Sequence, residues 1–238
     1  MTRIAAIVPA YNEASAISAV VNDINAVNQS QNLSIDVVVI NDCSTDTTSE
    51  IISNLNCISL HLPINLGIGG AVQTGFKYAL ENRYDYAIQI DGDGQHPANE
   101  IPKLVETAAA NSFNVVIGSR FISKQGFQSS AMRRVGINYF KWLNKILVAE
   151  KIYDSTSGFR LLDQKALSLV CDYYPDEYPE PEAIIIYAMH QLKIGEIPVS
   201  MNKRQGGVTS IGKIASLYYM FKVTLAIIFT FMRIKFKK

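Results

Sequence analysis

The sequence predicts a doubly wound α/β domain, and two observations support this fold class. Short apolar, β-rich runs alternate with longer helical patterns through the first half of the chain. Each run is continuous rather than alternating with polar residues, which is typical of strands buried on both faces of a parallel sheet. A sheet of this kind binds a nucleotide at the carboxyl ends of its strands.

The elements of the first half follow in chain order. Strands are expected at Ile4–Val8, Asp36–Ile40, Cys57–Leu60, Tyr86–Ile90 and Val115–Ile117. Helices are expected between them at Ala14–Val27, Thr47–Leu55, Gly69–Glu81 and Asn99–Ala110. Ser44, Thr45 and Asp46 offer capping oxygens before the second of these helices.

The second half of the chain is less regular. It is expected to contain an amphipathic helix at Met132–Val148, a strand or loop at Thr156–Leu162, a helix at Ala183–Leu192 and a late strand at Gly195–Val199. Tyr173–Glu182 is rich in Pro, Tyr and acidic residues, so no regular helix is expected there. Because the chain has neither an internal repeat nor a low-complexity linker, residues 1–213 are expected to form one domain, followed by a tail at 214–238.

The tail is apolar from Ile214 to Met232 and ends with the basic residues Arg233, Lys235, Lys237 and Lys238. A helix of this length just reaches across a hydrocarbon core of about 30 Å. Lys222 in its middle would cost roughly 2.5–3.5 kcal/mol there. We therefore favour an apolar helix that lies in the plane of an anionic membrane surface, with its Tyr and Phe side chains at the interface. Packing against the domain or a second subunit is the alternative.

Composition excludes several classes of protein. Of 238 residues, 48% are hydrophobic and 18% charged, so the chain is not disordered. A net charge of +1 gives no reason to expect nucleic acid as a partner. Three scattered cysteines suggest neither a disulfide framework nor a zinc site, and the apolar run Ile4–Val8 is too short for a signal peptide. We expect a cytoplasmic protein that is peripheral at the inner face of the cell membrane.

An acidic segment, Asp91-Gly92-Asp93-Gly94-Gln95-His96-Pro97, directly follows the fourth expected strand. Two carboxylates at the end of a buried strand are costly unless a cation or another partner holds them. Mg²⁺ and Mn²⁺ prefer oxygen ligands, and Mg²⁺ commonly joins one or two carboxylates to substrate phosphates. The segment therefore predicts a Mg²⁺ or Mn²⁺ site that bridges a diphosphate, whereas an Asp-Gly turn is the alternative. His96 is expected to fix the turn.

Polar segments also follow the first two strands, so the same edge of the sheet would gather them. They are Pro9-Ala10-Tyr11-Asn12-Glu13 and Asn41-Asp42-Cys43-Ser44-Thr45-Asp46. Tyr11 could stack on a nucleobase, and Glu13 and Asp42 could accept hydrogen bonds from a base or ribose. The Gly-rich segment 65–71 lacks both the dinucleotide spacing and the Lys-Ser/Thr of a P-loop. As alternatives, Glu13 and Asp46 could be helix caps.

These motifs, in this order, resemble the family-2 glycosyltransferases with the GT-A fold. Further along, four segments resemble the dolichol- or polyprenyl-phosphate mannose synthase branch. They are Gly118–Phe121, Arg133-Arg134, Asp154–Arg160, and Arg204 with the glycines that follow it. The resemblance covers about residues 3–213. It implies a GT-A sheet with an irregular acceptor half, and an inverting enzyme that takes a sugar, a hexose by preference, from a nucleotide-diphosphate sugar.

The resemblance also implies roles for single residues. The nucleotide would contact Pro9, Tyr11, Glu13, Asp42, Asp91 and Gly92, and the metal would be surrounded by Asp91, Asp93 and Gln95. Arg204 would reach the diphosphate and, with Asp93, belong to the catalytic set. Arg120, Arg133 and Arg134 match positions that hold an acceptor phosphate, with Arg160 lining the acceptor side; bidentate arginine contacts suit phosphate. Surface ion pairing is the alternative for these arginines.

The resemblance implies one further carboxylate, at the position where relatives carry their catalytic carboxylate. Glu182, at the mouth of the next helix, fits best by its distance to Gly195–Val199, and Glu180 is the backup. An acid that merely favours the helix N-terminus is the alternative.

The chemistry of the acceptor decides whether that carboxylate is needed. A polyprenyl phosphate arrives as an anion, so it needs arginines to orient it rather than a base. A sugar hydroxyl must lose its proton, which would make Glu182 essential. We favour a polyprenyl-phosphate acceptor at a membrane surface, and keep extension of a lipid-linked or cell-surface saccharide as the alternative.

Readings from other classes are less well supported. A nucleotidyltransferase should carry a Gly-rich phosphate loop with Arg or Lys near its N-terminus, and this chain does not. A non-catalytic partner subunit would have no need of both Asp91 and Asp93. Association with another copy or with a membrane protein is compatible with the tail, and the sequence does not name the donor base or sugar.

Overall fold

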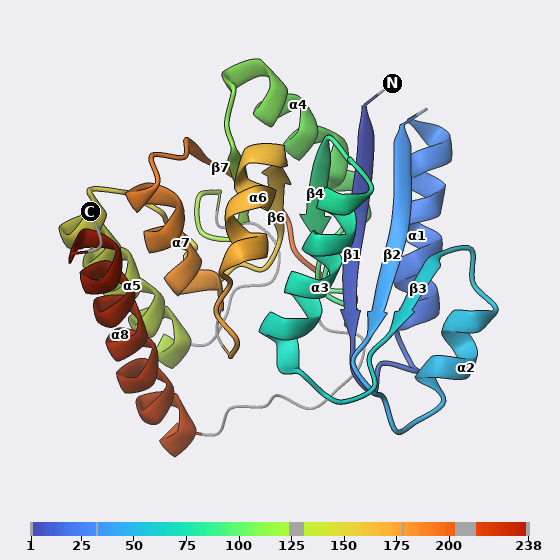
Figure 1. Ribbon diagram of the computed structural model, residues 1–238, viewed down its shortest axis with the longest axis horizontal. Helices are drawn as coiled ribbons and strands as arrows, with labels where there is room; N and C mark the ends of the chain where they lie inside the picture. The colour runs from blue at the N-terminus through green and yellow to red at the C-terminus, as the bar shows by residue number, and fades with distance from the viewer. Residues whose placement is uncertain (1, 32, 124–130, 178, 203–212, 237–238) are drawn as a thin grey trace.

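The computed structural model describes residues 2–31, 33–123, 131–177, 179–202 and 213–236. Within them, a seven-stranded sheet lies between helices on both of its faces (Figure 1). The strands are β1 Arg3–Ala10, β2 Ser34–Asn41, β3 Ile58–His61, β4 Tyr86–Gln89, β5 Val115–Ser119, β6 Arg160–Asp163 and β7 Ile194–Pro198. The helices are α1 Ile17–Ser30, α2 Thr48–Ser53, α3 Gly67–Glu81, α4 Ile101–Asn111 after the 3₁₀ turn η1 Ala98–Glu100, α5 Ala131–Val148, α6 Gln164–Asp172, α7 Pro179–Met189 and α8 Lys213–Phe236.

The sheet has the strand order β3-β2-β1-β4-β6-β5-β7. The donor half of the sheet is parallel, with Ile7 of β1 aligned to Val38 of β2 and to Gln89 of β4. β6 runs antiparallel to both β4 and β5, whereas β7 is parallel to β5. The predicted α/β class is confirmed, and the five strands expected in the first half, β1 to β5, all run in one direction. β6, in the segment expected as a strand or loop, is the antiparallel strand. A short strand buried on both faces has the same apolar sequence whichever way it runs, so the sequence does not reveal its direction.

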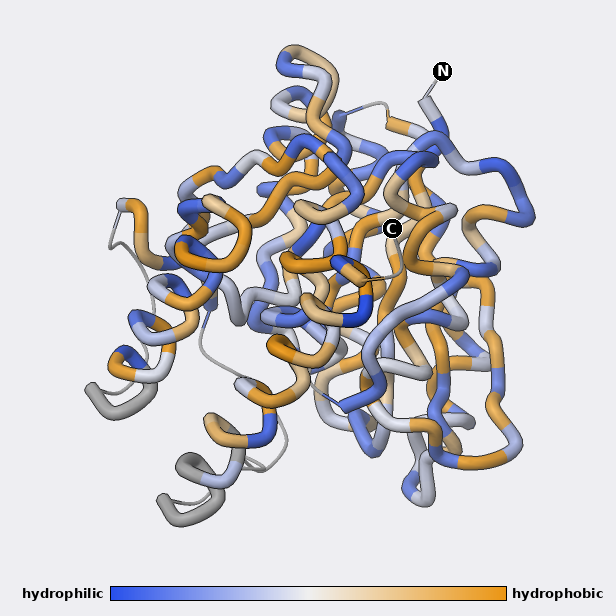
Figure 2. The backbone as a smooth tube through the Cα atoms, turned by 60° about the vertical axis from the view of Figure 1, so that its left-hand side comes forward, coloured by the Kyte–Doolittle hydropathy of each residue, from blue (hydrophilic) through white to orange (hydrophobic). Residues whose placement is uncertain are grey.

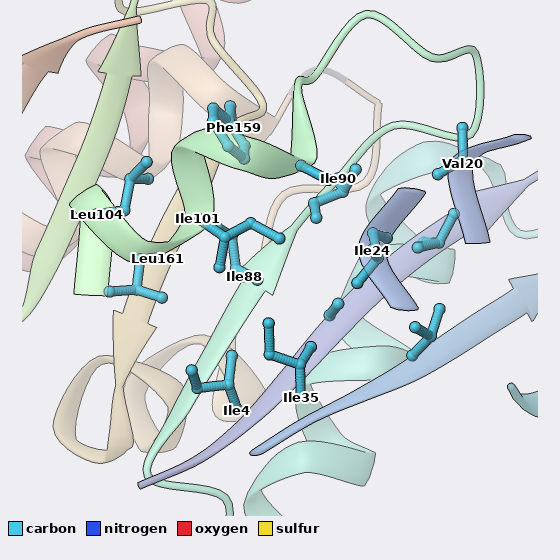
Figure 3. Close-up of a cluster of buried hydrophobic side chains, with 14 of the residues drawn as sticks. Ile4, Val20, Ile24, Ile35, Ile88, Ile90, Ile101, Leu104, Phe159 and Leu161 are labelled. Atoms are coloured by element: carbon cyan, nitrogen blue, oxygen red, sulfur yellow. The ribbon is translucent and has the colours of Figure 1, made fainter. Parts of the chain in front are cut away.

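Two apolar cores lie on opposite faces of the sheet. Alternate residues of β1 point to opposite faces, as the period of a strand requires. Ile4 and Val8 join the core under α1 and α4, which Figure 3 shows in close-up. Ala5 and Ile7 join the core under α3, α6 and α7. The β1 strand is therefore buried on both sides, which explains its continuous apolar sequence.

A third, smaller apolar cluster holds α5, α7 and α8 together at one side of the molecule. It contains Phe140 and Leu143 of α5, Ile185 of α7, and Val223 and Ile227 of α8. Figure 2, turned so that this side comes forward, shows hydrophobic and hydrophilic residues mixed along these helices. Among the described residues, no helix combines the length and the apolar character needed to cross a membrane.

Two differences from the expected elements lie in the second half of the chain. α6 was not expected, although Asp163 caps it by accepting a hydrogen bond at 2.8 Å from the backbone N–H of Ala166. α7 begins at Pro179, inside the segment where no regular helix was expected. Pro179 and Pro181 occupy the first turn of α7, where the missing N–H has no intrahelical partner in any case.

Candidate active site

A cavity of about 430 Å³ lies at the carboxyl ends of β1, β2 and β4. The residues that line it are Pro9, Ala10, Tyr11, Glu13, Asp42, Asn65, Gly67, Ile68, Ala71, Asp91, Gly92, Asp93 and Glu180. We call this cavity the donor pocket. All six residues predicted to contact the nucleotide line it, so the structure brings together motifs that lie far apart in the sequence.

The loops after β1 and β2 are joined through Asn12, which the sequence reasoning did not single out. Its φ of 56° places it in the left-handed region that Asn tolerates. Asn12 Oδ1 accepts hydrogen bonds from the backbone N–H groups of Thr45 at 2.8 Å and Asp46 at 3.3 Å. Tyr11 beside it remains 49% exposed at the pocket, which leaves its ring available for stacking.

Asp42 is a buried carboxylate that positions the start of α3. Its Oδ1 accepts from the backbone N–H of Leu66 at 2.7 Å, and its Oδ2 accepts from that of Gly67 at 2.9 Å. Each carboxylate oxygen can accept a second bond. Asp42 therefore shapes the pocket as well as lining it, and its contact with a nucleotide stays a prediction.

Asp91 is held from two sides. Its Oδ1 accepts from Gln89 Nε2 at 3.2 Å, and its backbone N–H donates to His96 Nδ1 at 3.0 Å. Because Nδ1 accepts, the neutral ring carries its proton on Nε2, which lies 3.6 Å from Asp91 Oδ2. His96 stacks on Phe159 with ring centroids 5.0 Å apart. His96 thus fixes the turn, as expected from the sequence.

Asp93 is almost fully buried, and its Oδ1 accepts from the backbone N–H of Gln95 at 2.9 Å. A Cβ at Gly92 would come within 2.9 Å of the carbonyl oxygen of Pro9, so this close approach requires glycine. Gln95 is not among the residues that line the donor pocket.

The side chains at the donor pocket supply only some of the ligands that a divalent cation needs. Within the part of the chain that the structure describes, no three His, Cys, Asp or Glu residues are arranged to hold a metal. Asp91 and Asp93 are nevertheless two carboxylates at one pocket, and Mg²⁺ is commonly bound by one or two carboxylates with substrate phosphates and water completing its shell. The residues present fit a metal that arrives with a diphosphate.

Glu180 reaches the donor pocket from the first turn of α7. Burial raises the pKa of its carboxyl group, an effect that the nearby Arg160 guanidinium opposes. Arg160 is itself buried, with its Nε donating to the carbonyl oxygen of Ser157 at 2.7 Å and its Nη2 to that of Ser155 at 3.0 Å. The expectation that Arg160 lines an acceptor surface is therefore not supported; its charge lies beneath the pocket.

Arg120 is also buried, in an ion pair with Asp154. Its Nε and Nη2 donate to the two carboxylate oxygens at 2.7 and 2.8 Å. The backbone N–H groups of Tyr153 and Asp154 in turn donate to Glu196, both at 2.7 Å. Arg120 therefore braces the end of β5 and is not a surface cation open to an acceptor. Asp154 begins a segment that the sequence analysis singled out, but its pairing with Arg120 has no local signal, because the two residues are 34 apart along the chain. Glu196 has no local signal either, since it lies 42 residues from Asp154.

The remaining predicted residues are not brought to the donor pocket. Glu182 is buried against α8, where its Oε1 accepts from Thr230 Oγ1 at 2.6 Å and Tyr173 Oη at 3.0 Å. Arg134 is exposed in the first turn of α5. Arg133 lies on the same turn, and the structure describes only its backbone. Arg204 lies outside the described residues.

Comparisons with known proteins find relatives among the glycosyltransferases. The sequence profile of "Glycosyl transferase family 2" matches residues 5–170. A UDP-N-acetylglucosamine–dolichyl-phosphate N-acetylglucosaminyltransferase of Methanococcus voltae is 30% identical, over 81% of this chain and 83% of its own. An undecaprenyl-phosphate mannosyltransferase of Micrococcus luteus is 30% identical, over 66% of this chain and 65% of its own.

A solved structure shares the fold. Glucosyl-3-phosphoglycerate synthase of Mycobacterium tuberculosis, in complex with Mn²⁺, uridine diphosphate and phosphoglyceric acid, superposes with a TM-score of 0.71 at 18% identity. The match covers 98% of this chain and 78% of that one. At this identity the likeness speaks for the fold alone, and the fold is that of a glycosyltransferase.

Proposed function

The chain belongs to glycosyl transferase family 2 and is a sugar-transferring enzyme, and from that premise we propose that it moves a hexose from a nucleotide-diphosphate sugar to a polyprenyl phosphate. The observation that carries this proposal is the donor pocket, where Asp91 and Asp93 face a cavity large enough for a nucleotide. Tyr11 stacks on the base, Glu13 and Asp42 accept from base or ribose, and the Gly92 backbone lets the sugar nucleotide approach the end of β4.

A divalent metal, Mg²⁺ or Mn²⁺, is part of the proposal. Asp91 and Asp93 would hold it together with the diphosphate, with Asp93 as the main ligand. When bound, the ion offsets the charge that develops on the leaving diphosphate. His96 and Gln89 keep Asp91 oriented for this role, since they bind its backbone and its carboxylate. Arg204 remains our proposed second cation for the diphosphate.

The acceptor is proposed from the relatives and from the charges of α5. The relatives described above are named for transfer to dolichyl phosphate and undecaprenyl phosphate. Arg134, exposed in the first turn of α5 beside Arg133, presents its guanidinium where a helix N-terminus also favours an anion. A phosphate oxygen of the acceptor attacks the anomeric carbon, the bond to the nucleoside diphosphate breaks, and the configuration inverts.

The saccharide-extending alternative is supported by one observation, the place of Glu180. A partly buried carboxyl whose pKa is raised by burial suits a general base for a sugar hydroxyl. Because Glu182 faces α8, the catalytic carboxylate that we propose for this alternative is Glu180.

The test is a screen of radiolabelled nucleotide sugars with the purified full-length protein and a short-chain polyprenyl phosphate. We expect label in a lipid product that mild acid releases, because a glycosyl phosphate bond is acid-labile whereas an ordinary glycosidic bond is not. A label that resists mild acid, and that requires a saccharide acceptor, would support the alternative instead.

We also propose that α5 and α8 form a surface that binds anionic membranes. Large apolar side chains are exposed along both helices, namely Val135, Trp142 and Ile146 on α5 and Tyr218, Phe221, Leu225, Phe229, Met232 and Phe236 on α8. Thr224 of α8 donates to Tyr139 of α5 at 3.1 Å, so the two helices lie side by side. Neither helix contains Asp or Glu, while each carries several Lys or Arg residues. Exposed apolar side chains on helices whose charged residues are all basic match the interface of an anionic bilayer.

Trp142 is the only tryptophan of the chain and is exposed on this surface, so its fluorescence reports binding directly. We expect a blue shift with vesicles that contain anionic phospholipid and none with neutral vesicles. The variants Phe221→Ser and Phe236→Ser should weaken the shift. Equal partitioning of wild type and variants between vesicles and buffer would contradict the proposal, and concentration-dependent dimerisation through this surface would replace it.

A further inference from the structure

Glu182 and Glu180 lie two residues apart in the first turn of α7 but face different parts of the molecule. Glu180 lines the donor pocket, whereas Glu182 lines a second cavity, of about 640 Å³, bordered by α8. A carboxylate as buried as Glu182 is costly without hydrogen-bond donors. Thr230 of α8 and Tyr173, before α7, supply two hydroxyl donors to its Oε1.

The same face of α8 makes further polar contacts with the segment 172–177. The guanidinium of Arg233 lies over the ring of Tyr173, with Cζ 3.9 Å from the ring centroid. Lys222 forms an ion pair with Glu177. Both cations come from α8 and both partners from the segment, so α8 is fastened to the segment along more than three turns of helix.

The same segment also contacts the first turn of α3, beside the donor pocket. The backbone N–H of Gly69, in the first turn of α3, donates to the carbonyl oxygen of Asp176 at 2.9 Å. A Cβ at Gly69 would come within 2.2 Å of the carbonyl oxygens of Pro175 and Asp176, so the contact requires glycine. Gly67 and Ile68, next to Gly69, line the donor pocket. The segment therefore lies between α8 and the pocket wall.

We infer that Glu182 is a positioning residue, which fastens α8 to the turn that carries Glu180 and so makes the tail helix part of the active-site scaffold. The inference rests on the proposed function in treating the donor pocket as the active site, and it deepens it by giving α8 a second role beside membrane binding. A carboxylate suits this position because one oxygen can accept from two hydroxyl groups at once.

The role predicts a particular order among variants. Glu182→Gln keeps an oxygen that can accept hydrogen bonds from Thr230 and Tyr173. The kcat on a soluble short-chain acceptor should therefore fall by less than about threefold, which is less than the loss expected when a hydrogen bond to a charged group is removed completely. Glu182→Leu removes the acceptor and leaves two hydroxyls without it, so kcat should fall by roughly tenfold to hundredfold. Thr230→Val and Tyr173→Phe should each show part of that loss.

Thr224→Val is the matched control, because Thr224 lies on the same helix but bonds to Tyr139 of α5 and to its own helix backbone. This variant should leave kcat unchanged. The KM for the nucleotide sugar should stay within about twofold in all of these variants, since none of them touches the residues proposed to hold the base and ribose.

Hydrogen exchange in the full-length protein gives a readout that needs no transfer. In Glu182→Leu and Thr230→Val, exchange should rise in peptides that cover 172–183 and α8, and it should not rise in Thr224→Val. If the choice of donor or acceptor is wrong, the wild-type enzyme will show no transfer while the exchange pattern still holds. If Glu182→Gln is as damaging as Glu182→Leu while Thr230→Val behaves as wild type, Glu182 acts in the chemistry and the positioning role is overturned. Unchanged exchange at 172–183 in Glu182→Leu would overturn it as well.

Discussion

The donor half of the molecule, β1–β4 with α1–α4, and the acceptor half, β5–β7 with α5–α8, hold their polar residues in different ways. In the donor half, pocket residues bond to backbone N–H groups of neighbouring loops, as Asp42 does to Gly67. In the acceptor half, two of the buried polar residues instead pair with side chains of distant elements, as Arg120 does with Asp154 and Glu182 with Thr230.

This difference predicts different consequences of mutation. A donor-pocket carboxylate ends a strand that is already buried and paired, so replacing it should remove chemistry and leave the fold intact. An acceptor-half side chain joins elements that have few other polar links, so replacing it should first weaken the fold. The predictions below test that contrast, beginning with the largest effect.

The Arg120–Asp154 pair should contribute most to stability. Arg120→Met leaves the Asp154 carboxylate buried without its partner, which typically costs about 3–5 kcal/mol. Urea unfolding monitored by circular dichroism measures the loss. The double variant Arg120→Met/Asp154→Leu should recover much of it, because no buried charge then remains. If Arg120→Met lowers the free energy of unfolding by less than about 1 kcal/mol, the pair does not stabilise the fold. Arg120 would then again be a candidate for binding the acceptor phosphate.

Asp93→Asn should do the opposite and remove activity at nearly constant stability. Losing the main metal ligand should cost several kcal/mol of transition-state stabilisation, or roughly 10²–10³ in rate. Transfer assays with and without EDTA, together with a thermal melt, measure both properties. The control is Asp23→Asn, which alters an exposed carboxylate on α1. Full activity of the wild type in EDTA would remove the metal from the proposal.

Arg134→Ala should weaken the binding of the polyprenyl phosphate acceptor without affecting the binding of the nucleotide sugar. A charge-assisted contact is worth about 1.5–3 kcal/mol, so the KM for the acceptor should rise roughly tenfold to hundredfold. Lys145→Ala removes an exposed cation from the last turn of the same helix and serves as the control. If both variants raise this KM equally, the effect is general charge attraction to the lipid rather than a contact with its phosphate.

Glu180→Gln should have the smallest effect if the acceptor is a phosphate. The nucleophilic oxygen then arrives deprotonated, so kcat should fall by less than about tenfold. With a sugar hydroxyl as acceptor, loss of a general base should cost on the order of 10²–10⁴ in rate. Steady-state kinetics with each acceptor class decides between them, and a nearly inactive Glu180→Gln on polyprenyl phosphate would overturn our preference.

The sequence by itself determined the donor half almost completely. Asp91, Asp93, Tyr11 and Asp42 each follow a strand whose apolar run is visible in the sequence, and parallel strands deliver such residues to one edge of the sheet. The strand, the turn and the ligand-facing residue are adjacent along the chain, so local patterns were sufficient.

Only the tertiary structure decided the acceptor half. The direction of β6, the burial of Arg120 and the orientation of Glu182 depend on partners 34 or more residues away, such as Asp154 for Arg120 and Thr230 for Glu182. Within one helical turn, residues two apart point about 200° apart, so the choice between Glu180 and Glu182 required knowing where α7 lies. A side chain's role there is set by what packs against it, and the sequence does not name that neighbour.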